Sequence, residues 1–154
     1  MKIKSIRNPS VEDYREVIKI RNQVFSAFPG YVEYDPETAF EKTKDQKDVI
    51  VYLAVSDTNE IIGFGMCYSR YPGYYHLWQL GVRESLRGQG IAQRLYEHVE
   101  EFAKENEYKG VTLNSNNMYK SSLRLAIKRG YEIYELDHSG NSALGPKIML
   151  KLTF

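Results

Sequence analysis

Residues 87–92, RGQGIA, are the stretch of this sequence whose residue types and spacing point most directly to chemistry. Two glycines flank a glutamine, an arginine precedes them, and an amphipathic segment follows. A glycine turn that runs straight into a helix leaves several backbone N–H groups unpaired, and the helix dipole adds partial positive charge at that end. Glycine also lets a ligand approach the backbone without a Cβ in the way. The stretch therefore predicts a site for phosphate or pyrophosphate, with a purely structural turn as the alternative.

Two common nucleotide-binding patterns do not fit this turn. The GxxxxGK[ST] pattern of nucleoside triphosphatases fails, because no Lys-Ser or Lys-Thr pair follows at the required spacing. The GxGxxG dinucleotide pattern also fails, because Gln93 stands where the third glycine would be. Arg83 and Arg87 contribute positive charge just upstream. The expected ligand is thus a phosphate-bearing molecule of another kind.

The composition is that of one globular domain, which we expect to span residues 1–154. Hydrophobic residues make up 42% and charged residues 27% of the chain. Lys plus Arg number 21 and Asp plus Glu 20, so the net charge of +1 gives no reason to expect nucleic acid or an anionic membrane as partner. No run approaches the ~18 apolar residues of a membrane span, and the first ten residues lack a signal-peptide core, so we expect a cytoplasmic location. The single cysteine, Cys67, lies in an apolar run and is expected to be a buried core thiol.

The hydrophobic periodicity predicts an α/β (α+β) fold with a mixed, predominantly antiparallel sheet of about seven strands flanked by about four helices. Strands are expected at residues 2–7, 49–55, 61–69, 74–82, 110–115, 131–137 and 145–152. Helices are expected after Ser10, at 36–46, over about four turns after the glycine turn, and at 118–129. Ser10 and Asp13 have the spacing of a capping box, and Gly130 is expected to end the last helix. Gly81, near the end of its strand, indicates either a bulge or a close backbone approach.

In this context RGQGIA resembles the R/Q-x-x-G-x-G/A signature of the GNAT superfamily of N-acetyltransferases. The strand QLGV precedes it and an amphipathic helix follows it. The segment VTLNS and a helix that runs into KRGYE come next. The resemblance extends over residues 2–152 in element order, and its specific motifs lie within 76–131. It implies direct transfer of an acetyl group from acetyl-CoA, as co-substrate, to the amine of a small molecule, polyamine or peptide. The two substrates would meet in a ternary complex, and no metal would be required.

The resemblance also implies which residues hold the cofactor. The CoA pyrophosphate would lie on the backbone of six residues: Arg87, Gly88, Gln89, Gly90, Ile91 and Ala92. Pantetheine and the thioester carbonyl would lie along the backbone of Leu80, Gly81 and Val82, where the strand splays from its neighbour. The side chains of Asn114 and Asn117 are candidates to bond the pantetheine amides, with loop capping as the alternative.

Acyl transfer of this kind needs a base for the amine proton and an acid for the departing thiolate. Family members often place a carboxylate base at the position of His76, whose ordinary pKa of ~6.5 would suit the role. The alternative is an ordinary histidine at a strand end. The family's usual acid is a tyrosine four residues before the exit glycine, and here that position is Ala126. We hypothesise that Tyr119, two turns away on the same helix face, supplies the hydroxyl instead. The alternative is a tyrosine that packs or stacks on CoA.

The segment FPGYVEYDP, residues 28–36, corresponds to the part of the family fold that often walls the acceptor pocket. Tyr31, Glu33 and Tyr34 are the candidate acceptor-binding residues, since carboxylates and aromatic rings together suit a cationic amine. A solvated acidic loop is the alternative. A non-catalytic acyl-CoA-binding module of the same fold is the second function that the sequence allows, because the usual tyrosine is missing. The identity of the amine and the choice between monomer and homodimer stay open.

Overall fold

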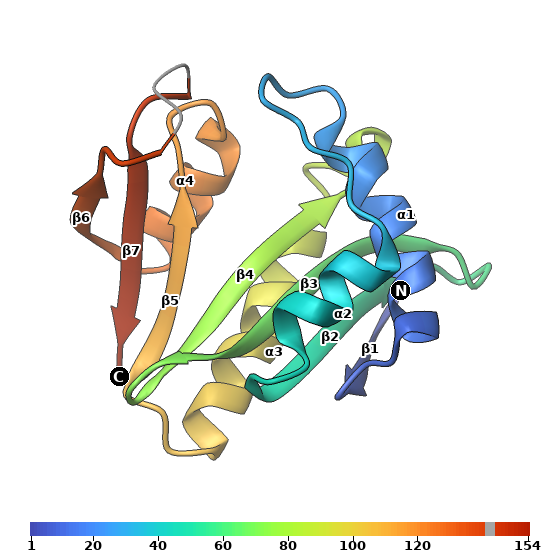
Figure 1. Cartoon of the computed structure of the whole chain (residues 1–154), viewed down its shortest axis with the longest axis horizontal. Helices are drawn as coiled ribbons and strands as arrows, with labels where there is room; N and C mark the ends of the chain where they lie inside the picture. The colour runs from blue at the N-terminus through green and yellow to red at the C-terminus, as the bar shows by residue number, and fades with distance from the viewer. Residues whose placement is uncertain (141–143) are drawn as a thin grey trace.

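One seven-stranded sheet runs through the whole computed structural model, which describes residues 1–140 and 144–154 (Figure 1). Its strand order is β1-β2-β3-β4-β5-β7-β6. Only the β4–β5 pair is parallel among the pairings described, and the other neighbours are antiparallel. The strands are β1 (Lys2–Arg7), β2 (Lys47–Val55), β3 (Ile61–Tyr71), β4 (Tyr74–Val82), β5 (Gly110–Ser115), β6 (Glu132–Asp137) and β7 (Lys147–Thr153). The predicted fold class and the predicted order of strands and helices are confirmed.

The first two helices begin at residues whose side chains cap them, Ser10 and Asp35. The helices are α1 (Val11–Phe25), α2 (Pro36–Thr43), α3 (Ile91–Glu105) and α4 (Lys120–Lys128), and a single 3₁₀ turn covers Glu84–Leu86. The predicted capping box of Ser10 and Asp13 is present at the start of α1. Asp35 caps α2, and the proline that follows it occupies the first helical position, where its missing N–H costs nothing. The helix α2 ends three residues earlier than predicted, and α4 starts two residues later.

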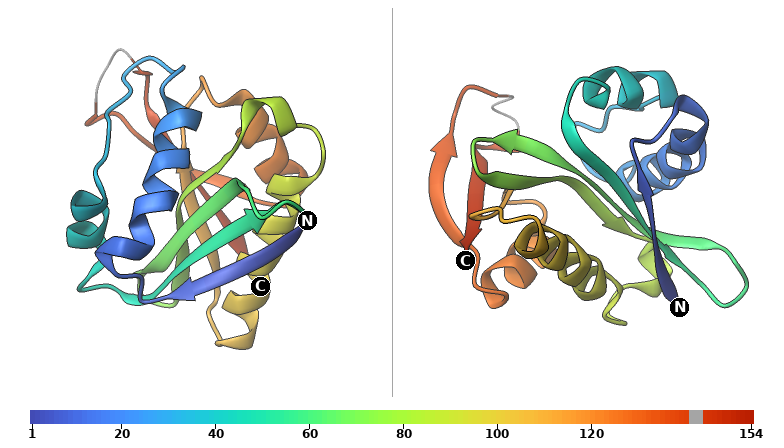
Figure 2. Two further views of the ribbon diagram at one scale, coloured as in Figure 1. Left: turned by 90° about the vertical axis from the view of Figure 1, so that its right-hand side faces the viewer. Right: turned by 90° about the horizontal axis from the view of Figure 1, so that it is seen from below.

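Alternating side chains of the strands bury two cores, one on each face of the sheet. On β2, Ile50, Tyr52 and Ala54 face the core under α3 and α4, while the intervening residues face α1 and α2. Figure 2 shows α1 and α2 on one side of the sheet and α3 on the other. Cys67 is buried in the first core, as predicted. No helix in the described part of the chain is long and apolar enough to cross a membrane.

The sheet opens between β4 and β5. Their pairing runs only from Tyr74 and Gly110 to Leu77 and Leu113, and Figure 1 shows the two strands diverging beyond that point. The register of β3 against β4 shifts at the same place, with Trp78 as the extra residue of a bulge. The last residues of β4 therefore have a strand neighbour on one side only, and the opening leaves room for a ligand.

Gly81 marks a close approach and not the bulge. A Cβ at this position would lie 2.7 Å from a ring carbon of Phe64 and 2.9 Å from Val24. Both alternatives were open from the sequence, because a bulge and a close contact each favour glycine in a strand. The structure assigns the bulge to Trp78, three residues earlier.

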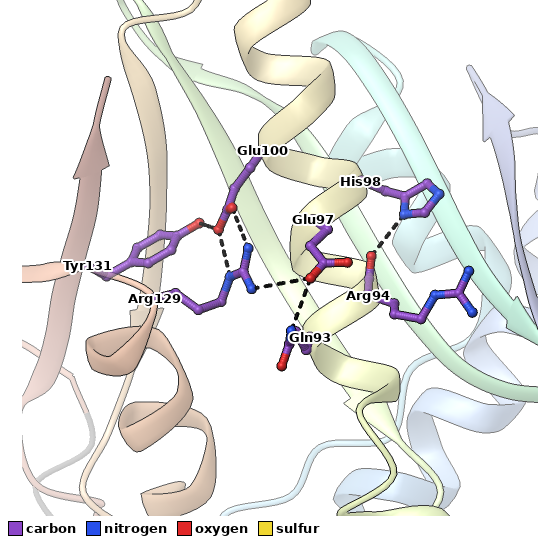
Figure 3. A network of polar contacts seen from close by, with 7 residues as sticks. All are labelled: Gln93, Arg94, Glu97, His98, Glu100, Arg129 and Tyr131. Carbon is purple, nitrogen blue, oxygen red and sulfur yellow. Dashed lines mark hydrogen bonds and ion pairs between the residues drawn. The ribbon is translucent and has the colours of Figure 1, made fainter.

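A buried ion-pair network joins α3 to the end of α4 (Figure 3). Arg129 donates to both carboxylate oxygens of Glu100, at 3.0 Å from Nε and 2.6 Å from Nη2, and the Tyr131 hydroxyl donates to Glu100 at 3.2 Å. Gly130, between these partners, has a φ of +97° and lets the chain leave the helix, as predicted. The network fixes the distance between two helices whose amino-terminal ends both border the site described next.

Candidate active site

The RGQGIA turn has the backbone of an anion site. Gly88 and Gly90 each have a φ of +79°, a conformation that favours glycine, and a Cβ at either position would meet no protein atom within 4 Å. Gly90 is also the N-cap of α3, and Arg94 is the first residue whose N–H bonds back into the helix. Within residues 1–140 and 144–154, the N–H groups of residues 88–93 have no protein acceptor. Together with the helix dipole they form a concentration of free donors suited to phosphates.

A cavity of about 550 Å³ lies against this turn. Eight of the nine predicted backbone residues line it: Leu80, Gly81, Val82, Arg87, Gly88, Gly90, Ile91 and Ala92. Gln89 does not. The cavity continues between α1 and the start of α4, over residues that the sequence did not single out: Val24, Phe25, Phe28, Met118, Lys120, Ser121 and Ser122. We refer to it as the turn cavity.

A second cavity of about 330 Å³ occupies the opening between β4 and β5. Its walls are residues 77–80 of β4, Leu113, Asn114 and Ser115 of β5, Arg21 and Phe25 of α1, residues 30–32 and Tyr34, and Tyr96, Tyr119 and Ser122. Its volume is at the small end of the range for small-molecule sites. We refer to it as the splay cavity.

Four residues line both cavities: Phe25, Leu80, Tyr119 and Ser122. A ligand that enters along the turn and a ligand held in the splay cavity would meet at this junction. The residues come from α1, β4 and the start of α4, so no single segment of the sequence contains the junction.

Tyr119 lies at the junction of the two cavities, but it is not on the helix, where the sequence placed it. It is the N-cap of α4 with a φ of −88° and a ψ of 55°, so it lies outside the helix and the argument from a shared helix face is wrong. Its ring packs edge-on against Phe28, with centroids 4.8 Å apart, and against Phe25 at 5.9 Å. Burial raises the pKa of its hydroxyl, and the nearby charge of Arg21 offsets part of that shift. Tyr119 therefore carries its proton at neutral pH.

His76 is placed in the sheet and borders neither the turn cavity nor the splay cavity. It is only 1% exposed, its Nδ1 lies 2.9 Å from the Thr112 hydroxyl, and Arg70 donates to its Nε2 at 3.4 Å. Burial, with the charges of Arg70 and Lys147, lowers its pKa to about 3. A neutral imidazole that is enclosed in this way has no access to a ligand in either cavity, which argues against the predicted base role.

The two asparagines predicted to bind pantetheine, Asn114 and Asn117, lie in different environments. Asn114 lines the splay cavity and not the turn cavity. Asn117 is exposed and borders neither cavity. The neighbouring Asn116 caps the loop, since its side-chain oxygen accepts the N–H of Met118 at 3.1 Å.

The three residues predicted to bind the acceptor, Tyr31, Glu33 and Tyr34, do not all line the same cavity. Tyr31 and Tyr34 line the splay cavity. Glu33 is exposed and borders a shallow surface depression together with Asp35, on the other side of the 28–36 segment. No aspartate, glutamate, lysine or histidine lines the splay cavity in the described part of the chain.

Among the described residues, Arg21 is the one charged side chain that lines the splay cavity, and it was not among the residues expected from the sequence. Its guanidinium lies 3.9 Å from the centre of the Tyr34 ring, and its Nε donates to Gln79 at 2.9 Å. It shares the helical spacing of the buried face of α1, with Val17 and Val24. A charged residue in such a stripe was the available signal, because arginine is seldom buried without a partner.

The sequence matches the family described as "Acetyltransferase (GNAT) family" over residues 15–131. The match covers most of the chain, which therefore belongs to this acetyltransferase family.

One curated relative is the L-2,4-diaminobutyric acid acetyltransferase of Halomonas elongata, with 45% identity over 49 residues. That match covers 30% of this chain and 26% of the relative, so the chain aligns with about a quarter of the relative's length.

Solved structures share the fold at low identity. The ribosomal-protein-alanine N-acetyltransferase of Brucella melitensis superposes with a TM-score of 0.80 at 15% identity, over 100% of both chains. The IAA acetyltransferase of Bacillus cereus gives 0.74 at 19% identity, over 99% of this chain and 100% of that one. A Bacillus anthracis protein solved in complex with acetyl coenzyme A gives 0.65 at 24% identity, over 74% of this chain and 68% of that one.

Proposed function

We propose that the protein transfers the acetyl group of acetyl-CoA to the amine of a small molecule, by direct attack in a ternary complex. The observation that carries this proposal is the junction of the two cavities at Phe25, Leu80, Tyr119 and Ser122. Free N–H donors at residues 88–93 suit the pyrophosphate of CoA. The related Bacillus anthracis structure, which contains acetyl coenzyme A, supports the same cofactor.

In the proposed reaction the amine nitrogen forms a bond to the thioester carbonyl carbon, and the carbon–sulfur bond then breaks. The CoA sulfur leaves with the electron pair and takes a proton. We propose that Tyr119 donates this proton, because its hydroxyl is protonated at neutral pH and its side chain lines both cavities. Alignment of the two substrates in adjoining cavities would supply much of the rate enhancement.

The amine must lose a proton as it reacts. Among the described residues that line the splay cavity there is no carboxylate or histidine to take it. We therefore propose that water accepts the amine proton, and that the fraction of neutral acceptor controls the rate below the amine's own pKa.

A non-catalytic acyl-CoA-binding module would need the turn cavity only. The splay cavity has no evident purpose in such a module, and its opening onto the junction favours the enzyme. We further propose that residues 1–154 form one domain, since a single sheet includes strands from β1 to β7. A cytoplasmic location and a homodimer stay predictions.

Release of free CoA thiol, measured with a panel of amines, amino acids, polyamines and peptides, tests the proposal. We expect release that depends on both acetyl-CoA and an acceptor. Tight binding of acetyl-CoA without thiol release for any acceptor class would contradict the enzyme and support the binding module.

A further inference from the structure

We propose that Arg21 binds a carboxylate of the acceptor, and that the acceptor is therefore an amino acid with an apolar or aromatic body. The inference rests on the proposed function, because it assigns the amine to the splay cavity. It reverses the preference for a cationic amine that the acidic 28–36 segment suggested.

Among the described residues, Arg21 is a buried cation without a counter-ion. The residue is 8% exposed, and no aspartate or glutamate of residues 1–140 and 144–154 lies within ion-pair distance of it. Removing a charge from water without a partner is costly, and buried charges in proteins are normally paired. A ligand anion would provide the missing partner.

The guanidinium has donors to spare. Nε donates to Gln79, and Nη1 donates to Asn22 at 3.0 Å and to the carbonyl of Val32. These acceptors are neutral, and they hold the guanidinium in place. Nη2 has no acceptor within the described residues, so two N–H groups are left on a cation that lines the cavity. A carboxylate is the usual partner for such an edge.

The rest of the splay cavity predicts the body of the acceptor. The rings of Phe25, Tyr31, Tyr34, Trp78 and Tyr119 form much of its wall. The Ser115 hydroxyl is buried at the same wall and has no hydrogen-bond partner in the described structure, so it is a further polar group open to a ligand or a water. Aromatic rings on several sides of the cavity favour an apolar or aromatic side chain between them.

The position of Arg21 relative to the junction limits the spacing between the carboxylate and the amine. Arg21 contacts Gln79, the neighbour of Leu80, and it lies 5.3 Å from the ring centre of Phe25. Leu80 and Phe25 both line the junction where the amine must meet the thioester. A carboxylate and an amine that are close together in one small molecule, as in an amino acid, fit this arrangement.

Matched acceptors test the inference on the wild-type protein without any substitution. Thiol release is measured with phenylalanine, with phenethylamine, which lacks the carboxylate, and with glycine, which lacks the ring. Rates are expressed per concentration of neutral amine, so that differences in amine pKa do not enter. We expect kcat/KM for phenylalanine to exceed that for phenethylamine by about 10- to 100-fold, since a hydrogen bond to a charged group has about that worth.

Variants then assign the preference to Arg21. Arg21→Gln is expected to remove the discrimination between phenylalanine and phenethylamine, mostly through KM of the acid, whereas Arg21→Lys should retain part of it. Arg15→Gln, an exposed arginine on the outer side of α1, is the matched control and should keep the wild-type ratio. If Arg21 only held the 28–34 segment in place, Arg21→Gln would lower both rates alike, and the inference would be overturned.

The failures of the two proposals can be told apart. No thiol release with any acceptor would contradict the proposed function. Equally efficient release with phenylalanine and phenethylamine would be compatible with the proposed acetyltransferase activity. It would contradict the inference that Arg21 binds a carboxylate of the acceptor. A kcat/KM for glycine equal to that for phenylalanine would contradict the inference that the acceptor has an apolar or aromatic body. Stabilisation of Arg21→Gln by acetyl-CoA, measured as a thermal shift equal to that of the wild type, shows that the variant is folded, because Arg21 does not line the turn cavity.

Discussion

The turn cavity and the splay cavity differ in how the chain builds them. The turn cavity depends on backbone N–H groups and two glycines within six consecutive residues. The splay cavity depends on side chains that come from α1, the 28–34 segment, β4, β5 and the start of α4. A backbone site tolerates many neighbouring side chains, while a side-chain site changes with every substitution in its wall. The comparison explains why one fold can keep its cofactor and vary its acceptor.

The largest expected effect lies where the two cavities meet. Tyr119→Phe should lower kcat by about 100-fold or more, because the thiolate would lose its proton donor while both cavities keep their shape. Steady-state thiol release measures kcat, and calorimetry with acetyl-CoA checks that cofactor binding is unchanged. Tyr134→Phe, an exposed tyrosine on β6, is the control and should behave as wild type. Full turnover by Tyr119→Phe would remove the acid role and leave a packing residue.

The next effect concerns the ion pair that joins α3 and α4, the two helices whose amino-terminal ends border the site. Arg129→Ala should lower the free energy of unfolding by about 3 kcal/mol, because it leaves Glu100 buried without its partner. Denaturant unfolding measures this change, and Arg124→Ala, on the exposed side of the same helix, is the control. A loss as small as that of Arg124→Ala would mean that the network is a surface feature and does not fix α4 on α3.

A third variant tests the turn cavity separately from the splay cavity. Gly90→Ala should weaken acetyl-CoA binding by about 10- to 30-fold, since the residue would have to keep a φ of +79° and its Cβ would enter the space in front of the turn. KM for the acceptor should change little. Gly130→Ala, with a φ of +97° away from both cavities, imposes a similar backbone strain and should leave acetyl-CoA affinity unchanged. Equal loss of affinity in the two variants would indicate general destabilisation instead.

The same contrast decides how much the sequence could predict. The hydrophobic periodicity placed β4 and β5 at their observed bounds, and the glycine spacing located the turn, because both signals are local. The splay, the junction and Arg21 depend on where β5 leaves β4 and on which loop folds over the gap. Most of those contacts join residues about 35 to 95 positions apart, and nothing in the local pattern encodes them. The helix-face argument for Tyr119 selected a residue that reaches the junction, although the helix begins one residue later.

The smallest expected effect tests the one polar group of β4 that the sequence assigned to catalysis. The pKa of His76 falls from an ordinary value of 6.5 to about 3 in the folded protein. The unfolded chain therefore binds more protons between these values, so the stability that His76 contributes is complete above about pH 6.5 and is lost as the pH falls toward 3. At pH 5 the loss amounts to about 2 kcal/mol at most.

Unfolding experiments at pH 7 and pH 5 measure this loss, and His76→Gln should remove the part that the imidazole causes. His138→Gln, an exposed histidine, should keep the wild-type dependence. The pH profile of acetyl transfer should be the same for His76→Gln and wild type, because the imidazole stays neutral throughout the working range. If the acidic limb of the pH profile moves with this substitution, His76 acts as the base for the acceptor amine. If the acidic limb is unchanged and follows the pKa of each acceptor amine, water takes the amine proton. Tyr119 at the junction would then be the protein's proton-transferring group.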